Sequence, residues 1–506
     1  MTEHDAAIVA LDHEHHRGVV DHRLFGSFVE HMGRCVYTGI YEPSHPTADA
    51  EGFRGDVSAL VRELGVTLVR YPGGNFVSGY DWRDGIGPRE QRPRRLDLAW
   101  RSIETNQVGT DEFMSWARAR GVEPMLAVNL GTAGVLDAAA LVEYCNVPEG
   151  TEWSERRRRN GTPKPHDVKL WCLGNEMDGP WQTGHSTAEQ YGALAAEAAK
   201  AMRLVDPEIE LVACGSSSHE MPTFGYWESS VLELAGDYVD YISMHAYYEE
   251  HDGDRDSFLA SGASMDAFIE GVIATIDAVG VRRRRTKQIN ISFDEWNVWY
   301  QSRYPGSEAM DIDIAGPRIE DQYSTLDAVV VGDLLSSLIN HADRVKIGAL
   351  AQLVNVIAPI MTEPGGALWR QPTFHTFAAV AAAARGNSLV TRVQAPGFGT
   401  RRYGEVPAVA ASATHDPTTG DVAVFLTNRA DHAVTVEVRH PGFDGWSTVS
   451  ALHLAADERG PRDRDTAADV RLTPLATSAS GDGRGTTLTL PPRSWTAVRA
   501  ESTSSD

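Results

Sequence analysis

The sequence predicts an α/β fold, a (β/α)8 TIM barrel followed by a jelly-roll-like antiparallel β-sandwich. Three observations support this prediction. The chain has 506 residues, which is too long for one ordinary domain and long enough for a large core. Between residues 20 and 385, short apolar runs alternate with amphipathic helices. After residue 386, short β-rich runs alternate with turns, and no helical period intervenes.

Eight runs in the first part are apolar almost throughout, which is typical of buried parallel strands. In chain order these predicted strands are 26–30, 66–70, 124–130, 168–176, 211–216, 241–247, 288–295 and 347–354. Their alternation with helices favours a closed barrel. A doubly wound open sheet is the alternative. It is disfavoured because no Gly-x-Gly-x-x-Gly follows the early strands, and Tyr-Pro-Gly-Gly-Asn at 71–75 is not a phosphate loop.

The predicted helices carry signals for where they begin and end. Apolar residues share one face over 57–64, and Gly65 is placed to end that helix. Thr187 and Gln190 form a capping-box pattern that predicts the start of another helix. A third helix is predicted over 266–279, and we expect the glycine that follows to end it.

The change of pattern divides the chain into three predicted parts. Residues 1–19 supply an N-terminal strand, around 6–11, that joins the β-sandwich. Residues 20–385 form the barrel and residues 386–506 form the sandwich. The polar, glycine-rich stretch 455–485 is expected to be a long exposed loop. The clearest sandwich strands are 422–426, 434–438, 486–490 and 495–498.

Composition excludes several classes of protein. An apolar fraction of 42% is that of a soluble globular protein, and the net charge of −24 argues against nucleic acid or an anionic membrane as a partner. The four cysteines match no metal or disulfide pattern, and those at 172 and 214 are expected to be buried free thiols. The acidic N-terminus lacks the apolar segment of a signal peptide, and no run of 18 apolar residues occurs. We therefore expect a cytoplasmic protein.

Two apolar segments end abruptly in a glutamate. Trp-Cys-Leu-Gly-Asn-Glu ends at Glu176, and Ile-Ser-Phe-Asp-Glu-Trp at 291–296 contains Glu295. A carboxylate at the end of a buried strand is unfavourable unless a site uses it. Two such carboxylates on the rim of one barrel are the pair that glycoside hydrolysis requires.

The other predicted strand ends are also polar. Amides, carboxylates and aromatic rings suit a sugar, whose hydroxyls need hydrogen bonds and whose apolar face stacks on rings. The histidines lack zinc-ligand spacing, and no Gly-x-Ser-x-Gly elbow occurs, so we expect no metal, no cofactor and no serine nucleophile. The strand-end residues are Glu30, His31, Arg70, Asn75, Asn129, Asn175, Glu176, His245, Tyr247, Glu295, Gln352 and Asn355.

Two carboxylates about 5 Å apart imply a retaining double displacement. One attacks the anomeric carbon in its ionised form. The other must begin protonated, gives its proton to the leaving oxygen, and later takes one from water. Asn175 can bond the sugar hydroxyl next to the reacting carbon, and this bond strengthens in the transition state.

The chain resembles the retaining glycosidases with catalytic glutamates on barrel strands 4 and 7, and more closely the α-L-arabinofuranosidases of glycoside hydrolase family 51. The resemblance covers nearly the whole chain. It rests on Gly-Asn-Glu at 174–176 and Asp-Glu-Trp at 294–296, together with Phe-Gly-Ser-Phe-Val-Glu-His at 25–31, Arg-Tyr-Pro-Gly-Gly-Asn-Phe at 70–76, 171–179, His-Ala-Tyr-Tyr at 245–248 and Gln-Leu-Val-Asn at 352–355.

This resemblance implies roles for ten residues. Glu176 would be the acid/base and Glu295 the nucleophile, whose charge Arg70 would support. It also implies exo-action on short arabino-oligosaccharides, a homohexamer, and an intracellular location. Matching furanose-binding residues are Glu30, Asn75, Asn175, Tyr247 and Gln352, and Trp100 and Trp181 match aromatics of the pocket wall.

Two other functions are alternatives. Another glycosidase with the same barrel, such as a β-xylosidase or an endoglucanase, would keep both glutamates but shape its loops differently. A non-catalytic carbohydrate-binding or assembly protein would be expected to lack one glutamate, and both are present. The sequence leaves the source polysaccharide and its linkage open, as well as any binding of sugar by the sandwich.

Overall fold

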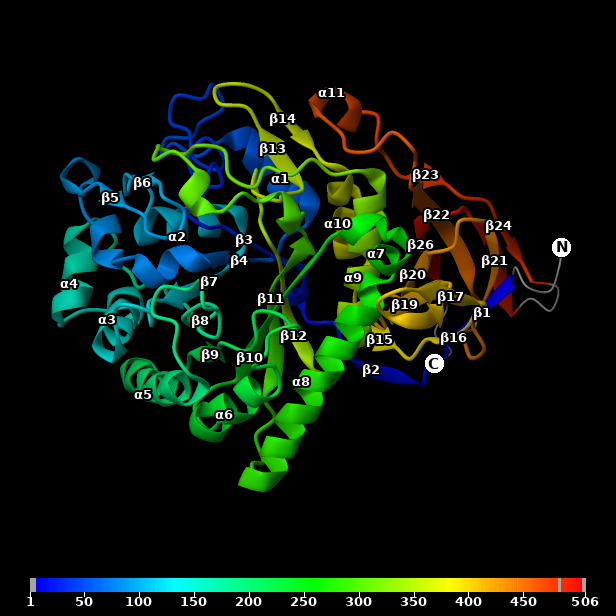
Figure 1. Ribbon diagram of the computed structural model, residues 1–506, viewed down its shortest axis with the longest axis horizontal. Helices are drawn as coiled ribbons and strands as arrows, with labels where there is room; N and C mark the ends of the chain where they lie inside the picture. The colour runs from blue at the N-terminus through cyan, green and yellow to red at the C-terminus, as the bar shows by residue number, and fades with distance from the viewer. Residues whose placement is uncertain (1–5, 444, 481–483, 503–506) are drawn as a thin grey trace.

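The computed structural model describes the chain except for residues 1–5, 444, 481–483 and 503–506. A barrel surrounded by helices lies beside a stack of antiparallel strands, and the two are aligned along the longest axis (Figure 1). Within the described residues, no helix is long and apolar enough to cross a membrane.

Across the described residues, eight parallel strands close into a barrel, in the order in which they follow along the chain. This confirms the predicted fold class, since every predicted strand region contributes one strand. The strands are β3 (Gly26–Phe28), β4 (Leu68–Tyr71), β7 (Glu123–Val128), β8 (Leu170–Leu173), β9 (Glu210–Ala213), β10 (Tyr241–Tyr248), β11 (Asn290–Val298) and β12 (Val345–Leu350).

Side chains fill the barrel, and an arginine closes its N-terminal end. One buried cluster includes residues from six of the barrel strands, among them Leu68, Met125, Leu170 and Ile347. The Arg23 guanidinium donates to Glu123 on β7 and to Glu210 on β9, at 2.6 and 2.8 Å. The bottom of the barrel is therefore packed and paired, which leaves the opposite end for a site.

The helices cover the barrel, and two of the three predicted signals are observed. Gly65 ends α1 in the left-handed region at φ 81°, and Thr187 accepts from the backbone N–H of Gln190 at 3.3 Å. The helices are α1 (Gly55–Leu64), α2 (Thr110–Arg120), α3 (Val135–Asn146), α4 (Glu152–Arg159), α5 (Ala188–Val205), α6 (Tyr226–Ala235), α7 (Arg255–Leu259), α8 (Ser261–Arg283), α9 (Thr325–Asn340), α10 (Pro372–Ala383) and α11 (Arg464–Ala467).

The predicted end of the third helix was wrong. Helix α8 continues through Gly280 to Arg283, and Arg284 ends it at φ 55°. Gly280 does not adopt the left-handed conformation that a glycine at a helix end would take, so the helix continues past it. Arg282 and Arg283 lie in the last turn, where positive charge is favourable to the helix dipole.

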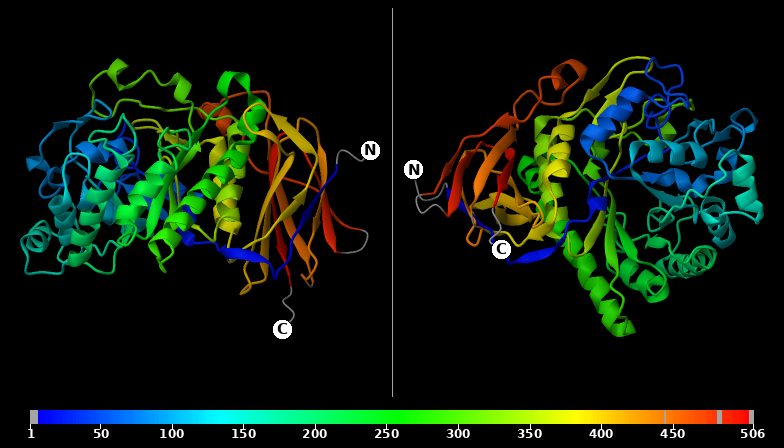
Figure 2. Two further views of the ribbon diagram at one scale, coloured as in Figure 1. Left: turned by 60° about the horizontal axis from the view of Figure 1, so that its bottom comes forward. Right: turned by 180° about the vertical axis from the view of Figure 1, so that it is seen from behind.

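The C-terminal strands pack as two sheets, five and seven strands wide within the described chain. Strand β1 (Ala6–Ala10) runs parallel to β21 (Val434–Arg439), with Val9 opposite Val438. Figure 2 shows the N-terminal segment passing from this sheet to the barrel. The division at residues 19 and 385 stays a prediction. The sheet orders are β16-β1-β21-β25-β24 and β2-β15-β19-β20-β26-β22-β23.

The remaining strands have these bounds: β2 (His16–Val19), β15 (Asn387–Leu389), β16 (Arg392–Gln394), β19 (Val409–His415), β20 (Asp421–Asn428), β22 (Ser447–Ala455), β23 (Thr473–Pro474), β24 (Thr477–Ala479), β25 (Gly485–Leu490) and β26 (Ser494–Glu501). The other short strands form two-stranded pairs, namely β5 (Arg95–Leu96) with β6 (Ile103–Glu104), β13 (Ile360–Thr362) with β14 (Leu368–Arg370), and β17 (Gly397–Thr400) with β18 (Gly404–Pro407).

The prediction of a long exposed loop over 455–485 was partly wrong: most of its described residues are exposed, but they do not all form loop. Helix α11 and strands β23 and β24 lie within it. Arg462 is buried, and its guanidinium donates to Asp457 at 2.6 Å. The backbone N–H of Arg462 also donates to the carbonyl of Tyr323, at 2.9 Å. The buried arginine of this mostly exposed segment is therefore paired, which the composition of the segment alone does not reveal.

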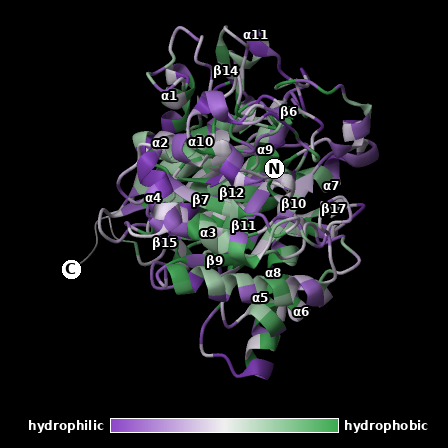
Figure 3. Ribbon diagram, turned by 90° about the vertical axis from the view of Figure 1, so that its left-hand side faces the viewer, coloured by the Kyte–Doolittle hydropathy of each residue, from purple (hydrophilic) through white to green (hydrophobic). Residues whose placement is uncertain are grey.

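Hydropathy follows these layers, with apolar strands inside and hydrophilic loops and outer helical faces around them (Figure 3). The four cysteines are free and buried, including Cys172 and Cys214, as predicted. Polar side chains that are buried in this apolar interior therefore need partners, and the densest group of them lies at the C-terminal ends of the barrel strands.

Candidate active site

A cavity of about 770 Å³ opens at the C-terminal ends of the barrel strands. It brings together eight of the ten predicted site residues, although they lie as far apart as 30 and 352 in the sequence. The other two, Arg70 and Asn175, are each about 1% exposed and lie behind the lining. The eight that line the cavity are Glu30, Asn75, Trp100, Glu176, Trp181, Tyr247, Glu295 and Gln352.

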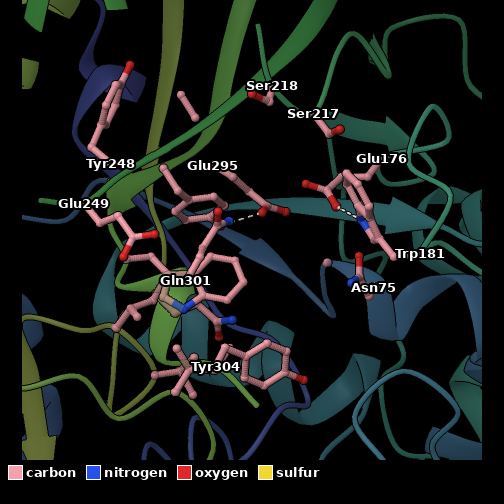
Figure 4. A pocket seen from close by; sticks show the side chains of 18 of the residues that line it. Asn75, Glu176, Trp181, Ser217, Ser218, Tyr248, Glu249, Glu295, Gln301 and Tyr304 are labelled. Atoms are coloured by element: carbon pink, nitrogen blue, oxygen red, sulfur yellow. Dashed lines mark hydrogen bonds between the residues drawn. The ribbon is translucent and has the colours of Figure 1, made fainter. Parts of the chain in front are cut away.

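Glu176 lies on a turn and not on a strand, contrary to the predicted strand 168–176. Strand β8 ends at Leu173, Gly174 follows at φ 92°, and Glu176 itself has φ 42°. A left-handed conformation at a residue other than glycine is unfavourable, and such conformations concentrate at functional sites. The turn directs the Glu176 carboxylate into the cavity (Figure 4).

Two donors bind the Glu176 carboxylate. Trp181 Nε1 donates to Oε2 at 2.7 Å, and His245 Nδ1 lies 2.9 Å from Oε1. The Trp181 side chain comes from the loop after β8 and is 53% exposed, so one of these two donors lies at the solvent boundary.

Glu295 lies within β11 and is bound from two sides. Arg70 Nη1 donates to its Oε1 at 2.6 Å, and the Tyr247 hydroxyl donates to its Oε2 at 2.7 Å. Both donors are fixed in turn. Arg70 Nη2 also donates to Asn175 Oδ1 at 2.6 Å, and Tyr247 packs edge-to-face on Trp299 with ring centroids 5.1 Å apart. Both oxygens of the Glu295 carboxylate are therefore held by hydrogen bonds.

The two glutamates face each other across the cavity (Figure 4). Atoms of Glu176, His245 and Glu295 lie within 4.8 Å of one another. This separation fits the close carboxylate pair of retaining glycosidases, about 5–5.5 Å, and is too short for the wider pair of inverting enzymes.

His245 lies among three carboxylates. Its Nε2 is 3.2 Å from Asp294 Oδ1, and its Nδ1 is 3.6 Å from Glu295 as well as bonded to Glu176. Burial alone would lower the pKa of His245, but the charges of Glu295, Asp294 and Glu176 outweigh it and raise the pKa to about 10.

Glu30 forms the opposite wall. It accepts hydrogen bonds from Trp100 Nε1 at 2.9 Å, from the backbone N–H of Phe76 at 2.9 Å and from Gln352 Nε2 at 3.0 Å. Burial raises the pKa of Glu30 to about 8, although the bonds from Phe76 and Trp100 oppose the rise. Gly74 is required here, since a Cβ at that position would lie 2.6 Å from the Glu30 oxygens.

Comparison with known proteins agrees with this geometry. The family models "Alpha-L-arabinofuranosidase 1 domain" and "Alpha-L-arabinofuranosidase C-terminal domain" match residues 60–262 and 294–494. An intracellular exo-α-(1→5)-L-arabinofuranosidase of Streptomyces lividans is 54% identical, over 95% of this chain and 73% of that protein. A Bacillus subtilis enzyme of the same description is 48% identical over 97% and 98%.

The chain belongs to the α-L-arabinofuranosidases of glycoside hydrolase family 51. The structure of a family 51 α-L-arabinofuranosidase from Bifidobacterium longum superposes with a TM-score of 0.93 at 45% identity, and covers 97% of this chain and 99% of that one. An arabinose complex of the Thermotoga maritima α-L-arabinofuranosidase superposes with a TM-score of 0.86 at 31% identity, over 98% and 100%. The barrel and the sandwich are therefore those of the family.

Sequence reasoning gave no role to several groups of this arabinofuranosidase site. His245 was noted as a strand end and as part of the motif at 245–248, and Asp294 only as part of a motif, yet they pair with each other beside the two glutamates. Asp178 accepts from the backbone N–H of Ser217 at 2.9 Å and ties the loop after β8 to the loop after β9. The position of Asp294 next to Glu295 was the one sequence signal that could have indicated these roles. The other contacts join loops that are distant in the sequence.

Proposed function

We propose that this arabinofuranosidase removes terminal α-L-arabinofuranosyl residues from short arabino-oligosaccharides by double displacement, with Glu295 as nucleophile and Glu176 as acid/base. The observation that carries these roles is the difference between two facing carboxylates. Glu295 accepts from the buried Arg70 and the partly buried Tyr247, and two such donors suit an anion that attacks carbon. Glu176 accepts from an exposed indole and lies beside the open part of the cavity.

In the first step, Glu295 attacks the anomeric carbon, while Glu176 gives its proton to the departing oxygen. Glu176 thereby becomes ionised within reach of two donors, the Trp181 indole and the protonated His245 ring. These donors stabilise the new carboxylate. In the second step Glu176 takes a proton from water, and the water oxygen replaces Glu295 at the anomeric carbon with net retention.

We propose that the furanose ring binds between the two glutamates and Glu30. Glu30 holds a proton below about pH 8, so it can donate to a sugar hydroxyl while Trp100 and Gln352 donate to it. Asn175 donates to Asn75 at 3.1 Å, which turns both amides toward the same side of the site. Such a closed set of polar groups fits one neutral sugar ring.

The relatives' names support the substrate class. Relatives at 54% and 48% identity are named for exo-action on α-(1→5) linkages, and one at 52%, from Bifidobacterium longum, for α-(1→6) linkages. We propose a linear α-(1→5)-linked substrate, drawn from arabinan or arabinoxylan fragments. Because several relatives are named intracellular, we also propose a cytoplasmic location.

Hydrolysis of a panel of aryl glycosides, with NMR of the first product formed, tests this function. Release of α-L-arabinofuranose from the α-L-arabinofuranoside, before the anomers equilibrate, is expected. Cleavage of a β-xyloside alone would favour a β-xylosidase, and a β-product would contradict retention. The hexamer expected from the family is tested separately by light scattering, with a mass near six times 55.2 kDa expected.

A further inference from the structure

A hairpin attached to the sandwich reaches the rim of the active-site cavity. Strands β17 and β18 pair with each other and belong to neither large sheet, and their turn consists of residues 401–403. Arg402 and Tyr403 in this turn line the same cavity as the two glutamates. Figures 1 and 3 both place β17 near α7, at the edge of the barrel.

Three contacts tie the turn to barrel loops. The backbone N–H of Arg402 donates to Ser257 Oγ at 3.1 Å, and Arg401 Nε lies 3.1 Å from Asp254 Oδ2. The Arg402 guanidinium pairs with Glu220, which follows β9. The hairpin is thus fixed over one side of the cavity, and its side chains form part of the wall.

This side lies across the barrel from the proposed furanose site. Glu30, Asn75 and Gln352 follow β3, β4 and β12, which are neighbours in the barrel. Glu220 and Asp254 follow β9 and β10, on the opposite arc, and Glu176 follows β8 beside them. The acid must lie next to the leaving oxygen, so the leaving group extends from Glu176 toward the loops after β9 and β10 and the hairpin above them.

The chemistry of the wall suits a neutral, hydroxyl-rich chain. Arg402 and Glu220 offer a donor and an acceptor side by side, and the half-buried ring of Tyr403 offers an apolar face. Glu220, Glu249 and Asp254 line this side and disfavour an anionic sugar. The Arg402–Glu220 pair is 35% and 60% exposed, so it contributes little to stability and can exchange partners with a ligand.

We propose that Arg402, Glu220 and Tyr403 form a subsite for the outer sugars of the leaving group, beyond the sugar that is bonded to the cleaved oxygen. The inference rests on the proposed function and extends it. The enzyme is thereby matched to linear oligosaccharides of three or more sugars. The subsite is built by the barrel and the sandwich-side hairpin together, so the C-terminal part of the chain contributes to specificity.

The test compares kcat/KM for 4-nitrophenyl α-L-arabinofuranoside, α-(1→5)-arabinobiose and α-(1→5)-arabinotriose. In Arg402→Ala, the ratio of arabinotriose to aryl glycoside is expected to fall about tenfold, the effect of one hydrogen bond to a charged group. The ratio for arabinobiose should change less. Glu405→Ala is the matched control, since Glu405 lies exposed on the same hairpin and outside the cavity lining, and its ratios should equal those of the wild type.

The outcomes separate this subsite from the proposed function. If the wild type failed to cleave the aryl arabinofuranoside, the proposed function would fail. If the wild type cleaved that glycoside but kcat/KM was no higher for arabinotriose than for arabinobiose, the subsite alone would be overturned. Equal losses on the aryl glycoside and arabinotriose in Arg402→Ala would also overturn it, because the arginine would then only tether the hairpin. Thermal unfolding of each variant checks that it is folded.

Discussion

The two sides of the active-site cavity differ in how firmly their carboxylates are fixed. Around Glu295, one partner, Arg70, is fully buried and the other, Tyr247, is partly buried. Arg70 is 1% exposed, and it and Tyr247 donate to the carboxylate at 2.6 and 2.7 Å. Around Glu176, one partner is buried and the other, Trp181, is 53% exposed. The chain builds a rigid anion on one side and an accessible carboxyl group on the other.

This difference matches what the two steps of a double displacement require. The nucleophile must stay ionised and aligned, and donors that are already in place provide this without reorganisation during the reaction. The acid/base must exchange a proton with the leaving group and then with water, so it needs access to both. Changes on the Glu295 side should therefore have larger effects than changes on the Glu176 side.

Among the residues that hold the two glutamates, replacement of Arg70 should lower activity most. Arg70→Met leaves Asp294 and Glu295 buried without their cation, and should lower the free energy of unfolding by about 3–5 kcal/mol. We expect kcat/KM on the aryl arabinofuranoside to fall about 10²–10³-fold. Arg54→Met is the control, since Arg54 is equally buried against Glu42 and Asp56, outside the cavity. Arg54→Met should lower the free energy of unfolding and leave kcat/KM unchanged. If kcat/KM fell equally in the two variants, the loss in Arg70→Met would not come from the active site.

His245 links the two sides and makes stability depend on pH. Its pKa in the folded chain, about 10, lies above the ordinary value of 6.5. The folded state therefore binds this proton more tightly, and the stabilisation is complete below pH 6.5 and is lost as pH rises through about 10. Measured by chemical denaturation, the free energy of unfolding of the wild type should exceed that of His245→Gln, and this difference should shrink between pH 6.5 and 10. An advantage that grew over this range would contradict the assignment.

Loss of a single donor to Glu295 should have an intermediate effect. Tyr247→Phe removes the hydroxyl that donates to Oε2 and keeps the ring against Trp299. We expect kcat/KM to fall about 10- to 100-fold, the effect of one buried bond to a charged group. Tyr300→Phe removes a comparable bond to Asp327 away from the cavity lining and should leave kcat/KM near wild type.

The smallest effect is expected on the Glu176 side. An added Cβ in Gly179→Ala would lie 2.5 Å from Trp181 Cε2, so the indole must move and its bond to Glu176 is lost. We expect kcat/KM to fall about three- to tenfold, as for one partly exposed hydrogen bond. Trp181→Phe should match it, while Gly399→Ala, where nothing lies within 4 Å, should be neutral. If kcat/KM fell further in Gly179→Ala than in Tyr247→Phe, the Glu176 side would be the more sensitive one, which would contradict this account.

Much of the fold could be predicted because its signals are local. Strands covered by helices on one face and packed side chains on the other are apolar throughout, so each predicted barrel strand corresponds to one observed strand. Since parallel strands end at one rim, residues as distant as Glu30 and Gln352 could be placed together, and they are bonded at 3.0 Å.

The features that were missed depend on contacts between distant segments. The left-handed turn that carries Glu176, the continuation of α8 past Gly280, and the burial of Arg462 have no local signature. The hairpin turn at 401–403 meets Glu220 across about 180 positions of sequence, and no periodicity indicates this pairing. Arg70 was expected to support the charge of Glu295 and donates to it, but its second bond, to Asn175 behind the cavity lining, had no local signal.

The most direct test of the two proposed roles is azide rescue of Glu176→Ala and Glu295→Ala on an aryl arabinofuranoside with a good leaving group. Glu176→Ala should still form the glycosyl-enzyme and then stall, and azide should restore turnover with an α-arabinofuranosyl azide of retained configuration. Glu295→Ala should lose on the order of 10⁴-fold in kcat or more. Rescue of Glu176→Ala with the inverted β-azide, and of Glu295→Ala with the α-azide, would show that the rigid and the accessible carboxyl groups have the opposite roles.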